Sequence, residues 1–109
     1  MSIDIPKLIQ SMLGAASGAA KGHAADLRNY LEARAKLIAE GVAAIASDRL
    51  KNVINDDDVR FAFDEIKASE VSARAAVTVT AKAAAQDAIN AALNVAASAI
   101  NAAVGIAIL

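Results

Sequence analysis

Apolar residues recur along this chain at the spacing of one face of an α-helix. In the first half the recurring positions are three, four or seven residues apart, and they are Leu27, Leu31, Ile38, Val42 and Ile45. A second stripe of the same kind follows, made of Val59, Phe63, Ile66, Ala73, Val77, Ala84 and Ala88. Such periodicity indicates amphipathic helices. The pattern therefore predicts two long helices and an all-α fold.

The charged residues lie away from these stripes. Arg60 and Asp64 are four residues apart, as are Glu70 and Arg74. Pairs at this spacing stabilise a helix by about 0.2–0.5 kcal/mol each. We expect them to lie on a solvated face and to decide nothing about function.

Turn-forming and capping residues mark the helix ends. Asp4 followed by Pro6 is typical of a helix start, because Asp accepts hydrogen bonds from unpaired amides and Pro needs no donor in the first turn. The helical pattern stops at four residues that suit a turn and a helix N-cap, Asn55, Asp56, Asp57 and Asp58. The sequence therefore predicts helices over about 5–52 and about 58–106, joined by a turn at 53–58.

One segment favours a strand locally, because all of its residues are β-branched: Val77, Thr78, Val79 and Thr80. A single short strand finds no partner in this sequence, and its backbone groups would stay unpaired. We therefore expect the helix to continue through 77–80 in a weakened form, with a hinge as the alternative.

Folding at the turn gives a long antiparallel helical hairpin in a single domain, residues 1–109. Two helices of roughly 45–50 residues would each run about 65–75 Å at 1.5 Å per residue. With 30 Ala against 32 larger apolar residues, so slender a core is marginal for an isolated chain. We therefore expect the hairpin to assemble into a multi-helix homo-oligomer.

Gly14, Gly18 and Gly22 recur every four residues and form a glycine zipper pattern on one helix face. A glycine inside a helix costs up to about 1 kcal/mol relative to Ala. Close approach of a second helix is the simplest compensation, and in the hairpin this glycine ridge would face the stretch 88–96. The alternative is a flexible linker, with a break in the helix near residue 22.

The C-terminal stretch is almost free of charge. Asp87 is the only charged residue between 83 and 109, and an eleven-residue repeat, 88–98 and 99–109, keeps like residues on one face. The apolar positions that we expect to pack against other helices include Ile89, Leu93, Ile100 and Val104. A polar arc on the same helix contains Asn90, Asn94, Ser98 and Asn101.

A helix that is apolar over roughly three quarters of its surface must be covered by several helices or by lipid. In a protein bundle, the asparagines of the polar arc would hydrogen-bond across an interface and fix its register. In a membrane, the same side chains would line a narrow wet channel. The sequence leaves both alternatives open.

Charge and composition exclude several classes of function. The 11 basic and 12 acidic residues leave a net charge of -1, which gives no field to attract nucleic acid. The absence of Cys removes disulfides, thiolate nucleophiles and Cys-based metal sites. No secretory signal is evident. We expect a cytoplasmic location or an assembled particle, with a membrane as the alternative.

No catalytic or metal-binding motif emerges. His23 is the only histidine and has no spaced carboxylate pair beside it. A calcium loop beginning at Asp56 would need Gly and Glu where the chain has Phe61 and Lys67. We therefore expect no enzyme activity, no cofactor and no small-molecule substrate.

These observations predict a non-enzymatic, self-assembling structural subunit, such as a component of an oligomeric bundle, a filament or a particle. The glycine ridge and the apolar C-terminal helix would join its copies. The alternative is a membrane-inserting or pore-forming protein whose Asn-lined C-terminal helices surround the channel.

Overall fold

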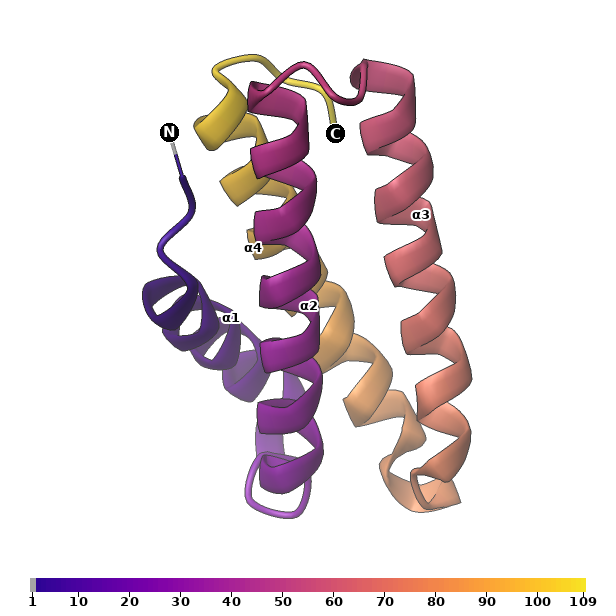
Figure 1. Ribbon diagram of the computed structural model, residues 1–109. Helices are drawn as coiled ribbons and strands as arrows, with labels where there is room; N and C mark the ends of the chain where they lie inside the picture. The colour runs from indigo at the N-terminus through magenta and orange to yellow at the C-terminus, as the bar shows by residue number, and fades with distance from the viewer. Residues whose placement is uncertain (1) are drawn as a thin grey trace.

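Residues 2–109, which the computed structural model describes, form four α-helices (Figure 1). They are α1 (Ile5–Ala20), α2 (Arg28–Leu50), α3 (Asp56–Ala73) and α4 (Lys82–Val104). The prediction of an all-α fold is confirmed. The prediction of a hairpin of two long helices is wrong, because each arm is divided in two and the molecule extends only 43 Å along its longest axis.

The first arm is interrupted between α1 and α2, at the position of the break predicted as an alternative. Lys21 ends α1 with a positive φ of 53°. A short 3₁₀ helix, Lys21–His23, and a turn follow, and the backbone reverses direction before Arg28. A positive φ is unfavourable for a residue with a Cβ. Lys21 nevertheless adopts it, although the next residue is Gly22.

The second arm is interrupted at the β-branched segment, where a continuous helix was predicted. Val77 and Thr78 have extended backbone angles, between the short 3₁₀ helices Arg74–Ala76 and Val79–Ala81. The amide of Val77 donates to the carbonyl of Arg74, and that of Ala81 to the carbonyl of Thr78, at 3.0 Å each. Local turns thus pair the Val77 amide and the Thr78 carbonyl without a partner strand.

The helix starts follow the capping residues. Asp4 accepts a hydrogen bond from the Lys7 amide at 3.2 Å. Asn55 is the N-cap of α3, where its Oδ1 accepts from the Asp58 amide at 2.9 Å and its own amide donates to the Asp58 carboxylate at 3.0 Å. This reciprocal pair gives partners to two backbone amides at the helix start, those of Asn55 and Asp58.

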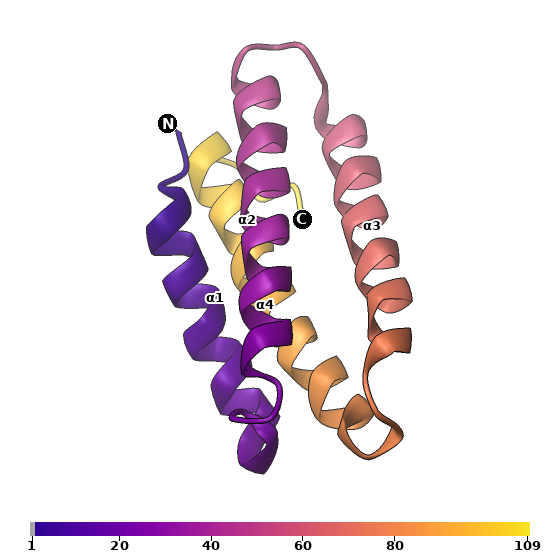
Figure 2. The same cartoon turned by 60° about the horizontal axis from the view of Figure 1, so that its bottom comes forward.

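The core is centred on α4, and α1 and α3 lie on opposite sides of α2 and α4 (Figure 2). The buried residues of α4 are Ala85, Ala88, Ile89, Ala92, Leu93, Ala96 and Ile100. Alanines at the contact positions let neighbouring helix axes come close together. We expected other chains or lipid to cover the apolar surface of the C-terminal helix. Over this face of α4, α1 and α2 of the same chain cover it instead.

Hydropathy of the four helices bears on the membrane alternative. No helix within residues 2–109 combines the length and the apolar character that crossing a bilayer requires.

Of the four helices, α3 is the most loosely held. It packs mainly against α2 and makes little contact with α4. Its buried residues within the fold are Val59, Phe63 and Glu70. A helix held on one side leaves its other faces available for contacts outside the chain.

Candidate functional site

A buried ion pair joins α3 to α2. Arg34 and Glu70 form a bidentate pair, with Nε to Oε1 at 2.9 Å and Nη2 to Oε2 at 2.6 Å. The Glu70 side chain is 2% exposed and that of Arg34 is 19% exposed. The prediction that Glu70 lies on a solvated face beside Arg74 is therefore wrong, because Glu70 continues the buried stripe of α3.

The same contact shapes the electrostatics around Tyr30. Hydrogen bonds to Glu70 raise the pKa of Arg34, which keeps the pair charged. Burial raises the pKa of Tyr30, and the negative charge of Glu70 adds to the effect. The Tyr30 hydroxyl is buried and has no hydrogen-bond partner. An unpaired buried hydroxyl costs stability.

Tyr30→Phe is accordingly expected to increase the free energy of unfolding by about 1 kcal/mol, because it removes the unpaired hydroxyl and keeps the ring. Urea denaturation at neutral pH measures this gain. A loss of stability would show that the hydroxyl makes a favourable interaction.

The titration of Tyr30 provides a second measurement of its surroundings. Its raised pKa means that the folded chain holds the phenolic proton more tightly than the unfolded chain, so stability should fall as the pH rises above about 10. This tyrosine is the only one in the chain. Its absorbance change on ionisation therefore reports the site directly.

A groove separates α3 from α4 and is the candidate functional site. Two hollows of about 620 and about 470 Å³ adjoin one another, and both are lined by Lys67, Leu93 and Asn94. From α3 and its C-cap, Arg74, the groove is lined by Arg60, Phe63, Asp64, Lys67, Val71 and Arg74. From α4 it is lined by Asn90, Leu93, Asn94, Ala97, Ser98 and Asn101.

The groove has a cationic wall, an amide wall and an apolar floor. Arg60, Lys67 and the helical C-cap Arg74 are spaced by seven residues and so lie on one side of α3 and its end. Lys67 Nζ lies 5.4 Å from the centre of the Phe63 ring and 4.0 Å from the Asp64 carboxylate. Leu93 is buried opposite them. Such a surface suits a partner that presents carboxylates around an apolar side chain.

The C-terminal tail, residues 106–109, closes one end of the groove. Gly105 has a φ of 86° and turns the chain back after α4. The Asn101 side chain accepts hydrogen bonds from the amides of Ile108 and Leu109, each at 3.0 Å. Arg60 Nε donates to the Ile108 carbonyl at 3.3 Å. Contacts from both helices therefore hold the tail in place.

All four members of the predicted polar arc line the groove, but their contacts differ. Asn90 and Asn94 are exposed and line the groove. Ser98 lies on the exposed side of α4, between the groove and a hollow next to α1. Asn101 binds the tail. The predicted packing residues Ile89, Leu93 and Ile100 lie in the core of the chain itself, and Val104 is half-buried at its edge.

The glycine ridge lies on the surface. Gly14, Gly18 and Gly22 are exposed, and a Cβ built on any of them would have no neighbouring atom within 4 Å. α1 packs on the fold through a different stripe, made of Leu8, Met12, Ala16 and Ala20. The prediction that the ridge faces 88–96 is therefore wrong within one chain.

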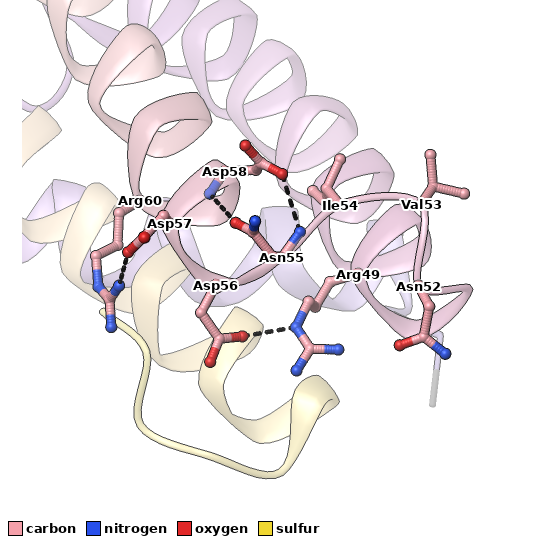
Figure 3. Close-up of a pocket in the computed structure, with 9 residues that line it drawn as sticks. All are labelled: Arg49, Asn52, Val53, Ile54, Asn55, Asp56, Asp57, Asp58 and Arg60. Carbon is pink, nitrogen blue, oxygen red and sulfur yellow. Dashed lines mark hydrogen bonds and ion pairs between the residues drawn. The ribbon is translucent and has the colours of Figure 1, made fainter.

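The turn between α2 and α3 gathers charged side chains around a hollow of about 740 Å³ (Figure 3). Arg49 pairs with Asp56, and Arg60 with Asp57, each at 2.6 Å. These contacts fix the start of α3. In the part of the chain that the structure describes, no group of three or more His, Asp or Glu side chains is placed to hold a metal ion.

Comparisons with models of known protein families, with curated proteins and with solved structures returned no match.

Proposed function

We propose that this protein is a non-enzymatic helical subunit that assembles with copies of itself, as part of a bundle, a filament or a particle. The observation that carries the proposal is the loose packing of α3 and the exposure of its apolar side chains. This helix is anchored on α2, is separated from α4 by an open groove, and exposes 68% of Phe61 and 59% of Val71.

Exposed apolar side chains scattered singly over a surface are ordinary. Phe61 and Val71, by contrast, lie on the same loosely packed helix, and Val71 lines the groove itself. Aromatic and apolar anchors next to charged groups are typical of protein interfaces. The proposal places the protein in the cytoplasm or in an assembled particle and includes no cofactor and no small-molecule substrate.

Sedimentation velocity of the purified chain over a wide concentration range, without detergent, tests the proposal. A self-assembling subunit should shift to larger species as the concentration rises. A chain that stays monomeric at every concentration would refute self-assembly. Added liposomes test the membrane alternative, because a pore-forming protein should bind them and release a trapped dye.

The glycine ridge provides a separate prediction. Gly18→Ala should raise the free energy of unfolding of the monomer by about 0.5–1 kcal/mol, because the space around Gly18 is open and Ala favours a helix more than Gly does. Thermal and urea unfolding at low concentration measure this effect. A loss of stability would contradict the open environment of Gly18.

The bulkier change Gly18→Leu then reports on assembly. If copies approach one another closely at the ridge, this variant should form smaller assemblies than the Gly18→Ala protein. Equal assembly by the two variants would remove the ridge from the interface and leave the α3 side of the molecule as the contact surface.

A further inference from the structure

The groove is matched by a second surface on the same helix. On its outer side, α3 presents what we term the donor face: Asp58, Phe61 and Glu65, which are spaced by three and four residues and so share one side of the helix. All three are exposed, and none of them lines the groove of its own chain. The donor face therefore combines two carboxylates with an exposed aromatic ring.

We infer that the donor face of one copy docks in the groove of another copy, an inference that rests on the self-assembly proposed above. Phe61 of the first copy enters the hollow of about 470 Å³ between Lys67 and Arg74 of the second and packs against Val71 and Leu93. Asn90 and Asn94 border the same hollow and supply amide groups at its edge.

Charge and spacing support this pairing. Asp58 and Glu65 are seven residues apart, and so are Lys67 and Arg74. Because the C-cap Arg74 still has helical backbone angles, each pair spans about 10.5 Å along the helix axis. When the two helices run antiparallel, Glu65 meets Lys67 and Asp58 meets Arg74, with Phe61 beside Val71 between them. Complementary charges in this arrangement select the partner and fix its position.

The donor face and the groove lie on different sides of the same helix, so the contact joins unlike surfaces. Each added copy leaves one donor face and one groove unoccupied. Head-to-tail contacts of this kind produce a ring when the rotation closes and a filament when it does not.

Charge reversal tests the contact. Lys67→Glu and Glu65→Lys are each expected to raise the dissociation constant for assembly about tenfold or more, because like charges then face each other across the contact. Lys82→Glu serves as the matched control, because Lys82 is exposed on α4 and lines neither hollow of the groove. Sedimentation velocity measures assembly, and circular dichroism shows that each variant remains helical.

An equimolar mixture of the Lys67→Glu and Glu65→Lys proteins is the decisive experiment. In the mixture, the reversed groove of the Lys67→Glu protein should accept the reversed donor face of the Glu65→Lys protein, and the remaining groove and donor face form the parental contact. Assembly of large species should therefore recover, although each variant alone assembles weakly. Recovery supports the inference. Normal assembly of the single variants, or no recovery in the mixture, overturns the inference and leaves self-assembly through another surface. A monomeric parent chain overturns the proposed function itself.

Cross-linking locates the contact independently, because the chain has no Cys. A Phe61→Cys protein mixed with a Val71→Cys protein should form a disulfide-linked heterodimer on mild oxidation. Each variant alone should form far less of the linked species. Equal linkage in the separate variants and in the mixture would contradict the docking of Phe61 beside Val71.

Discussion

Replacing Arg34 with Ala is expected to lower the free energy of unfolding by about 3–5 kcal/mol, the usual cost of removing one partner of a buried ion pair. Glu70 is 2% exposed and accepts both of its hydrogen bonds from Arg34. Without that guanidinium, the carboxylate is left buried and unpaired. Urea denaturation followed by circular dichroism measures the loss.

Two comparisons separate this effect from a general effect of removing an arginine. Arg28 pairs with Glu32 on the exposed surface of α2, so Arg28→Ala should cost no more than about 0.5 kcal/mol. The double variant Arg34→Met with Glu70→Leu should recover most of the stability, because it removes both buried charges together. Equal losses from Arg34→Ala and Arg28→Ala would contradict the structural role of the buried pair.

The second large effect is expected at the centre of α4. Ala92→Leu should lower the free energy of unfolding by about 1–3 kcal/mol, because added methylene groups in a well-packed core force neighbouring groups apart. Ala92 is fully enclosed where α1 and α2 pack on α4. A urea unfolding curve at low protein concentration measures the change without a contribution from assembly.

Ala83→Leu is the matched control for this substitution. Ala83 lies on the same helix and is exposed, so the larger side chain should change stability by less than about 0.5 kcal/mol. An Ala92→Leu protein as stable as Ala83→Leu would show that the helices around α4 are not closely packed.

The periodic pattern and the capping residues were sufficient to predict an all-α fold. The stripe from Leu27 to Ile45 is buried along α2, and Asn55 caps α3. These features depend on residues close together in the sequence. Local spacing therefore carried enough information to predict them.

The breaks in the two arms required information that local spacing does not carry. At 77–80 we expected a helix because a lone strand would leave backbone groups unpaired. Local turns instead pair the Val77 amide with Arg74 and the Thr78 carbonyl with Ala81. Once the arms are divided, α1 folds back over α4, and the apolar face of α4 is covered within the chain.

The candidate site was only partly accessible to sequence analysis. The polar arc was recognised, but whether Asn90 and Asn94 face another chain, a channel or α3 depends on tertiary structure. Glu70 continues the stripe that contains Val59 and Phe63, and that position was a signal of burial. Its partner, Arg34, lies 36 residues away, so the pair could not be derived from helical spacing.

The tail held by Asn101 and Arg60 makes the two ends of the groove unequal. The end near Arg60 is occupied by Ile108 and Leu109, whereas the tail does not line the hollow near Arg74. For the proposed docking, the groove is therefore blocked at the end near Arg60 and open at the end near Arg74. Under the proposed docking, this asymmetry sets one direction along the assembly.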